Sequence, residues 1–144
     1  MSERFLPYAA VWVLVYNEKQ EICLLRRFNT GYIDGTYTVP AGHLEEGESL
    51  QQGAYREALE EAGITITDSK LVHTAYRERR NDRIYIDAFF EVLDYQGEVY
   101  NAEPNKCDEV IWVSKDNLPS AIAPSLKFAL EAIFRGEIYS EYVE

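Results

Sequence analysis

The segment REALEEAG, residues 56–63, places Glu57, Glu60 and Glu61 within five consecutive positions. In a helix, Glu57 and Glu61 lie one turn apart, where like charges repel by about 0.2–0.5 kcal/mol per pair. The neighbouring arc of that helix carries apolar residues, small enough in most cases to pack closely on a sheet: Ala54, Ala58, Leu59 and Ala62. The helix is therefore expected to hold its carboxylates at a fixed edge of that contact.

Two interpretations fit this acidic cluster. It is either a solvated face, with Arg56 and Glu60 paired at i,i+4, or a site for a divalent cation. Hard cations bind carboxylate and carbonyl oxygens at about 2.0–2.6 Å, so coordination turns the local repulsion into binding energy. The upstream loop PAGHLEEGE, residues 40–48, favours the cation because it carries three more glutamates to the start of the helix.

Elsewhere the chain alternates strand-like and helical stretches. Runs of β-branched and aromatic residues predict strands at 8–16, 21–27, 37–39, 70–79, 83–93 and 109–113. We expect the first two to pair as a hairpin, and the two long ones to be joined by a turn at Arg80, Asn81 and Asp82. The tail after residue 136 carries no clear pattern.

Two helices are expected, at 49–62 and 123–136. Their ends carry the usual start and stop residues: a capping box of Ser49 and Gln52, then Gly63, and later Pro124 and Gly136. Strands that flank and separate two helices predict a single domain over residues 1–144 with a mixed α/β sandwich fold.

The composition excludes several classes of partner. With a formal charge of −11, the chain repels nucleic-acid polymers, whose binding depends on Lys and Arg. A small anion stays compatible, since a bound metal ion offsets local charge. Cys23 and Cys107 stand far apart and outside any metal-ligand spacing, which is typical of a reduced, cytoplasmic protein. The apolar run near the N-terminus is too short to cross a membrane, so no membrane partner is expected.

The spacing of the polar residues resembles the Nudix box, G-x5-E-x7-R-E-U-x-E-E-x-G-U, where U is a bulky aliphatic residue. The pattern begins at Gly42, continues at Glu48 and ends with residues 56–64. All of its polar and glycine positions match, while Ala58 stands where a larger aliphatic residue is commoner. The predicted order of elements is similar to the α/β/α sandwich with a mixed sheet of MutT-like Nudix hydrolases.

This resemblance implies a site for Mg²⁺ or Mn²⁺ with four ligands: the carbonyl of Ala41 and the side chains of Glu57, Glu60 and Glu61. It also implies an ion pair between Arg56 and Glu48 that orients the glutamates. The implied reaction is hydrolysis of a nucleoside diphosphate linked to another group, with water attacking one phosphorus.

A general base must accept the proton of that water. Glu57 is the first candidate, although it is also expected to be a metal ligand. Glu60 is also expected to be a catalytic residue. Some relatives place a further glutamate in a loop before a late strand, and Glu103, next to Pro104, is the residue expected here. The alternative is that Glu103 is an ordinary loop residue.

Substrate binding is expected from four cationic or titratable side chains: Arg26, His43, Arg77 and Arg79. Strand alternation places one of the two arginines that end the second strand toward the site, and Arg26 is preferred over Arg27. The same alternation puts Arg77 and Arg79 on one face, although a solvated hairpin tip explains them equally well.

The substrate is predicted by elimination. Signatures of the family's ADP-ribose, dinucleoside-polyphosphate and coenzyme A hydrolases are not evident, which leaves a nucleoside triphosphate or a modified one. The alternatives are a catalytically idle Nudix-fold ligand sensor and a hydrolase of another derivative, such as a dinucleoside polyphosphate or nucleotide sugar. The apolar first strand and the tyrosine-rich tail offer surfaces for a homodimer, and the oligomeric state stays open.

Overall fold

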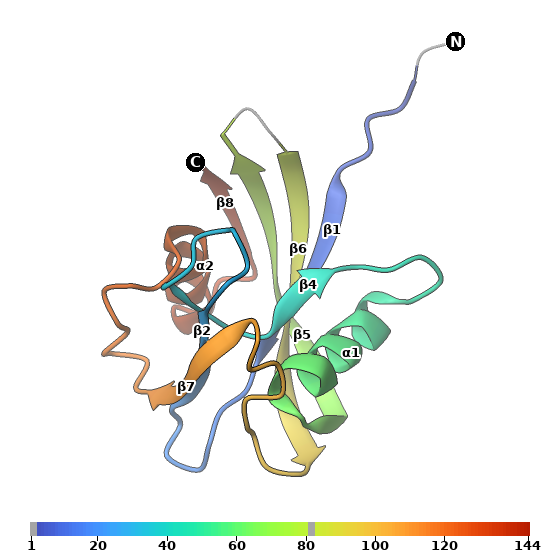
Figure 1. Cartoon of the computed structure of the whole chain (residues 1–144). Helices are drawn as coiled ribbons and strands as arrows, with labels where there is room; N and C mark the ends of the chain where they lie inside the picture. The colour runs from blue at the N-terminus through green and yellow to red at the C-terminus, as the bar shows by residue number, and fades with distance from the viewer. Residues whose placement is uncertain (1–2, 81–82) are drawn as a thin grey trace.

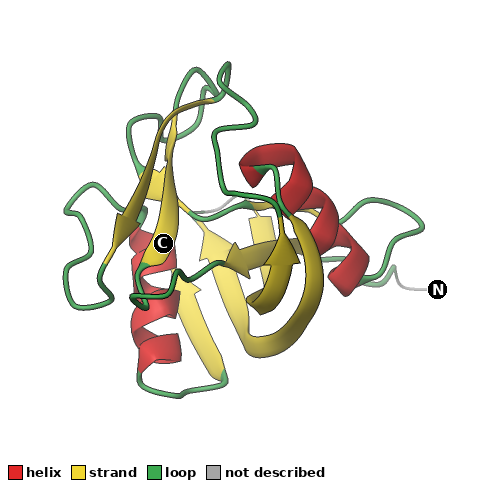
Figure 2. Ribbon diagram, turned by 90° about the horizontal axis from the view of Figure 1, so that it is seen from below, coloured by secondary structure: helices red, strands yellow, loops and turns green. Residues whose placement is uncertain are grey.

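The computed structural model describes residues 3–80 and 83–144, which form two helices and eight strands (Figure 1). The first half contains β1 (Tyr8–Leu14), β2 (Ile22–Arg27), β3 (Tyr37–Thr38), β4 (Ala41–His43) and α1 (Leu50–Ala62). The second half contains β5 (Thr65–Arg79), β6 (Arg83–Gln96), β7 (Cys107–Val113), α2 (Pro124–Phe134) and β8 (Tyr139–Val143). The strands lie between the two helices (Figure 2), which confirms the predicted sandwich.

Within the described residues the strands form two sheets. The larger has the order β4-β1-β6-β5-β8, and it is mixed, because β1 runs parallel to β6 and antiparallel to β4. Its long antiparallel pair, β5 and β6, projects as an arm above the helices in Figure 1. The smaller sheet has the order β3-β2-β7 and is antiparallel. As a result, β4 of the larger sheet and β2 of the smaller sheet lie next to the part of α1 that carries the box glutamates.

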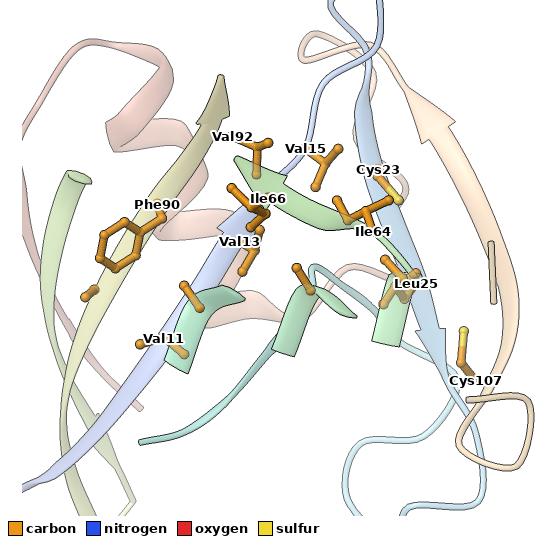
Figure 3. Packing of buried hydrophobic residues seen from close by; sticks show 14 residues of the cluster. Val11, Val13, Val15, Cys23, Leu25, Ile64, Ile66, Phe90, Val92 and Cys107 are labelled. Atoms are coloured by element: carbon orange, nitrogen blue, oxygen red, sulfur yellow. The ribbon is translucent and has the colours of Figure 1, made fainter. Parts of the chain in front are cut away.

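Alternating side chains of β1 and β2 fill two apolar cores. One core lies under α1 and contains Val11, Val13, Val15, Cys23 and Leu25 (Figure 3). The intervening residues face the other core, under α2: Leu14, Ile22 and Leu24. Because successive side chains of a strand point to opposite faces, both strands are buried on two sides. This double burial explains why their sequences are almost continuously apolar.

Helix α1 begins and ends where its capping residues predict. The Ser49 backbone N–H donates to Oε1 of Gln52 at 2.8 Å, and the Gln52 N–H donates to Oγ of Ser49 at 3.1 Å. Gly63 ends the helix in the left-handed region, with φ 70°. A side chain there would also overlap the ring of Tyr100, so glycine is required twice over.

The inner face of α1 differs in part from the predicted one. Leu59 was expected on the packed arc, but it is 54% exposed, whereas Glu57 is buried beside Ala54 and Ala58. The helix is rotated so that the stripe 54–58–62 points to the core, and this rotation carries Glu57 and Glu61 inward. The carboxylates therefore lie on the contact face itself and not only at its edge.

The predicted hairpin of the first two strands is wrong beyond its turn. Close to the turn, the Cys23 N–H donates to the Val15 carbonyl at 2.9 Å, and Tyr16 bridges Ile22. Farther along, β1 pairs with β4 and β6, while β2 pairs with β3 and β7. An alternating pattern specifies which faces of a strand are buried, but not which neighbour it takes.

Three other features of the chain were missed or misplaced. Strand β5 starts at Thr65 rather than at residue 70, and register shifts at its start obscure the alternation. Strand β4 lies inside the box loop, and β8 in the unassigned tail runs parallel to β5. The turn predicted at Asn81 and Asp82 lies outside the described residues.

Neither helix in the described part of the chain has the length and apolar character needed to span a bilayer.

Candidate active site

A cleft of about 420 Å³ lies between α1, the end of β2 and the loop that precedes β7. Its acidic lining residues are Glu45, Glu57, Glu60, Glu61 and Glu103. Its basic lining residues are Arg26, Arg27, Arg56 and Lys106. The box glutamates and the late-loop glutamate, separated by about forty positions in the chain, thus share one cavity. Glu57, Glu60, Glu61 and Glu103 line this cavity. Glu48 does not line it, and it accepts a hydrogen bond from Arg56.

Arg56 is the centre of the polar network at the base of the cleft. Its Nε and Nη2 donate to the two carboxylate oxygens of Glu48 at 3.0 and 2.7 Å. Its Nη1 donates to Oε1 of Glu57 at 2.7 Å, and Nη2 also donates to the carbonyl of His43 at 3.1 Å. Hydrogen bonds from Arg56 lower the pKa of Glu48 to about 2. The guanidinium therefore ties the helix to the box loop and fixes one oxygen of Glu57.

Two further carboxylates lie at the edge of this network. Arg56 Nη1 is 3.3 Å from Oε2 of Glu45 and 3.4 Å from Oε2 of Glu60. Glu60 is largely exposed, so this contact matches the i,i+4 pair of a solvated helix face. Glu60 thus faces water, as the solvated interpretation expects, whereas Glu57 faces the protein.

Glu57 and Glu61 form a close carboxyl pair on the inner face of α1. Burial, and then the neighbouring Glu57 carboxylate, raise the pKa of Glu61 well above its usual range. The Ala41 N–H donates to Oε2 of Glu61 at 3.1 Å. A Cβ at Gly42 would overlap the Glu57 carboxylate, so the glycine of the box leaves the room that this side chain occupies.

The donor set of this pair fits a hard divalent cation. Two carboxylates that repel each other in a partly buried place are stabilised by a proton or by a metal ion. No three Asp, Glu, His or Cys side chains among residues 3–80 and 83–144 converge into a ready-made cage. Arg56 engages one oxygen of each of two box glutamates, Oε1 of Glu57 and Oε2 of Glu60.

Glu103 lies across the cleft from the carboxyl pair, and its charge adds to the raised pKa of Glu61. Its loop is held by backbone contacts, because the N–H groups of Lys106 and Cys107 donate to the Glu103 carbonyl at 2.9 Å. The two acidic residues that follow in this stretch have other partners. Asp108 accepts two hydrogen bonds from Arg26, and Glu109 accepts the Tyr37 hydroxyl at 2.7 Å.

Arg26, the preferred arginine, lines the cleft, and Arg27 does so as well, so the structure does not separate the two. The pairing of β2 with β7 shifts register between these two residues, which breaks the alternation on which the choice depended. Arg26 is held in a fork by Asp108, with its Nε at 2.7 Å from Oδ1. Arg27 also lines the neighbouring pocket.

That neighbouring pocket, of about 370 Å³, shares part of its wall with the cleft. The other predicted substrate residues line it: His43, Arg77 and Arg79. Of the two cavities, His43 lines this pocket and not the cleft. Its Nε2 lies 2.9 Å from the Tyr85 hydroxyl.

Asp87, which holds the predicted substrate residue Arg77, was not predicted from the sequence. It is 1% exposed, and its carboxylate accepts two hydrogen bonds from Arg77, at 2.7 and 3.0 Å. The signal was present, because a charged residue inside the apolar run IYIDAFF needs a partner of opposite charge. The nearest arginine on the preceding strand supplies it.

The comparisons agree with this geometry. The family profile described as "NUDIX domain" matches residues 6–133. The chain is 30% identical over 122 residues to the NAD-capped RNA hydrolase NudC of Shigella dysenteriae serotype 1 (strain Sd197). That match covers 85% of this chain but 46% of the relative, so the chain spans about half the length of NudC.

Two solved structures have the same fold. A MutT NUDIX hydrolase from Burkholderia pseudomallei superposes with a TM-score of 0.80 at 21% identity, covering 88% of this chain and 98% of that one. The MutT protein from Methanosarcina mazei Go1 superposes with a TM-score of 0.79 at 26% identity, covering 93% and 97%. With the family profile extending over most of the chain, this protein belongs to the Nudix hydrolase family and has the fold of its MutT-like members.

Proposed function

We propose that the chain is a divalent-metal-dependent pyrophosphohydrolase of nucleoside diphosphates linked to another group. The preferred substrate is a nucleoside triphosphate or a modified one, which would give the monophosphate and pyrophosphate. The observation that carries the proposal is the Glu57–Glu61 carboxyl pair, set against Gly42 inside a cleft with Glu103 opposite. A catalytically idle sensor has no need of this complete set.

The proposed ligands of Mg²⁺ or Mn²⁺ are the carbonyl of Ala41 and the carboxylates of Glu57, Glu60 and Glu61. When bound, such an ion supplies charge neutralisation of the phosphate oxygens and acidifies a water molecule. Arg56 and Glu48 position Glu57, because the guanidinium is clamped by one carboxylate while it donates to the other. Burial and the neighbouring Glu57 raise the pKa of Glu61, so a bound cation would relieve the repulsion between the two carboxylates.

The remaining groups of the cleft bind phosphate and accept the proton. Arg26, Arg27 and Lys106 are cationic lining residues suited to a diphosphate, and Arg26 is already oriented by Asp108. Glu57 and Glu103 are the two candidates for the general base. Glu103 has the advantage that Arg56 does not hold it. Removing each base in turn, with the pH profile of kcat as readout, separates the two.

A second candidate reaction is cleavage of a dinucleotide at its diphosphate. The similarity to the NAD-capped RNA hydrolase NudC favours it, at 30% identity over 122 residues. The same carboxyl pair would serve either reaction, because both substrates present a diphosphate to the cleft.

The test is a panel of nucleoside triphosphates, oxidised nucleotides and dinucleotides, assayed with Mg²⁺, with Mn²⁺ and with a chelator. Phosphate is measured after treatment with inorganic pyrophosphatase. We expect metal-dependent hydrolysis of at least one substrate class, lost in Glu57→Gln and retained in Glu46→Gln, an exposed glutamate of the loop that precedes α1. A uniformly feeble response with both metals would overturn the proposal.

A further inference from the structure

The pocket beside the cleft has the opposite charge to the rest of the chain. Among the described residues that line it, four are arginines, Arg27, Arg77, Arg79 and Arg83, and Glu61 is the acidic one. The chain as a whole has a formal charge of −11. A concave surface that concentrates one sign of charge raises the local concentration of the opposite ion. The pocket is therefore suited to an anionic group.

Arg77 is firmly held by a buried carboxylate. Its Nε and Nη2 donate to the two carboxylate oxygens of Asp87 at 2.7 and 3.0 Å, and the two side chains are 12% and 2% exposed. The fork engages one edge of the guanidinium. No hydrogen bond from Nη1 to another described residue accompanies it, although Arg77 lines the pocket. A guanidinium fixed in this way keeps donors for a further acceptor.

Aromatic rings hold the Arg77 guanidinium from a second direction. Its central carbon lies 4.0 Å from the centroid of the Tyr85 ring and 5.3 Å from that of Trp12. Tyr85 is itself fixed by its hydroxyl contact with His43. Stacking and the Asp87 fork together leave the cation little rotamer freedom to lose on binding, which is the condition for tight recognition of an anion.

An internal ion pair is the alternative role for these two residues. Such a pair is often no better for stability than apolar residues of similar size. A purely structural pair would be sealed from water and from ligands, but Arg77 contributes to the wall of a 370 Å³ cavity. The arrangement therefore suits recognition better than stability.

The pocket also lies where a substrate would extend from the cleft. The two cavities share Arg27, Thr38, Ala41 and Glu61 as lining residues. A diphosphate near the carboxyl pair would thus have one of its substituents directed over Ala41 into the arginine-lined pocket.

We propose that this pocket binds a phosphate group carried by the substrate in addition to the two phosphates of the cleaved bond. Arg77 is the specificity-determining donor, and Asp87 is the residue that positions it. The proposal rests on the proposed function for its account of the cleft, and it defines the substrate class as nucleotides with an extra phosphate. That phosphate is either the terminal one of a triphosphate or one on a ribose hydroxyl.

Matched pairs of ligands that differ by one phosphate test the proposal. Binding is measured by calorimetry in the presence of a chelator, so that no hydrolysis occurs. The pairs are ADP with ATP, AMP with adenosine 2′,5′-bisphosphate, and AMP with adenosine 3′,5′-bisphosphate. In at least one pair, we expect the ligand with the extra phosphate to bind about tenfold more tightly or better.

The variants decide whether Arg77 carries that preference. Arg77→Met leaves Asp87 buried without its partner and endangers the fold, so Arg77→Met is also combined with Asp87→Leu. We expect the preference to fall below about twofold in the double variant. We expect Asp87→Asn to keep part of it, because the arginine stays but loses its charged clamp. The control is Arg135→Met, at an exposed residue paired with Glu137 far from the pocket in sequence.

Two pairs of substrates that differ by one ribose phosphate are then compared in the presence of Mg²⁺: coenzyme A with dephospho-coenzyme A, and NADP with NAD. We expect Arg77→Lys to raise KM for the phosphorylated member more than it lowers kcat. No preference in any binding pair, or a preference that survives in the double variant, would overturn the inference. Absence of all hydrolysis would instead sink the proposed function, and the chelator measurements would still decide the pocket.

Discussion

The acidic cleft and the arginine-lined pocket share a wall but are organised in opposite ways. In the cleft, Arg56 is surrounded by carboxylates and holds Glu48 and Glu57 in place. In the pocket, a single buried carboxylate, Asp87, holds Arg77 among arginines and aromatic rings. In the cleft an arginine orients carboxylates, whereas in the pocket a carboxylate orients an arginine. The contrast supports the two proposals, a cation site in the cleft and an anion site in the pocket beside it.

The largest effect is expected from a substitution that removes one member of the carboxyl pair. Glu57→Gln or Glu61→Gln should lower kcat at least about a hundredfold, since losing a residue that only supports a metal ligand already costs about 10–100-fold. Steady-state kinetics at saturating Mg²⁺ measure this loss. Glu46→Gln is the control, and near-normal rates in either variant would remove that glutamate from the metal site.

The next effect concerns Arg56. Arg56→Lys keeps the charge but loses the fork to Glu48, so Glu57 is less well oriented. We expect the Mg²⁺ concentration for half-maximal activity to rise about 10–100-fold. A metal titration of activity gives this value, and an unchanged midpoint would show that the fork does not prepare the cation site.

A smaller effect concerns the stability of the metal-free protein. The pKa of Glu61 is raised in the folded state, so the folded protein holds this proton at pH values where the unfolded chain has lost it. The free energy of unfolding therefore falls as pH rises from the ordinary glutamate pKa toward the raised one. Glu61→Gln removes this loss.

Urea unfolding in the presence of a chelator measures this pH dependence of the free energy of unfolding. Glu61→Gln should gain stability relative to the unmodified chain between about pH 4.5 and pH 7.5, and it should lose the stabilisation that Mg²⁺ gives the unmodified chain. An equal difference between the two proteins at both pH values would contradict the prediction.

The smallest effect separates the contribution of the Tyr85 ring from that of the Tyr85 hydroxyl group. Tyr85→Leu removes the ring beneath Arg77, and cation–π contacts of this kind contribute about 0.5–2 kcal/mol, or about 2- to 30-fold in affinity for the phosphorylated ligand. Tyr85→Phe keeps the ring and loses the contact with His43, so its effect should stay below about threefold. Calorimetry with the matched ligands measures both, and equal losses would assign the effect to the hydroxyl.

Local signals in the sequence predicted the box helix well. Ser49, Gln52 and Gly63 act within one turn of their own positions, so the ends of α1 follow from neighbouring residues alone. The same holds for Pro124 at the start of α2. Glu57 and Glu61, which the family pattern singles out, both line the cleft, although Leu59 shows that the exact rotation of the helix depends on the sheet beneath it.

Features that depend on distant pairing were not predictable in this way. The neighbours of β1 come from the box loop and from β6, and β8 finds β5 across more than sixty residues. The irregular register at Arg26 and Arg27 likewise arises from β7. These arrangements are set by tertiary packing, about which periodicity carries no information.

The three-residue strand β4 separates the two cavities. Gly42 adjoins Glu57 of the cleft, while the next residue, His43, reaches Tyr85 of the pocket. Bond cleavage would depend on α1 and the box, whereas the choice of compound would depend on the β5–β6 arm. Such a division lets selectivity diverge by exchange of the arm while the chemistry stays constant, so relatives with nearly identical boxes need not consume the same metabolite.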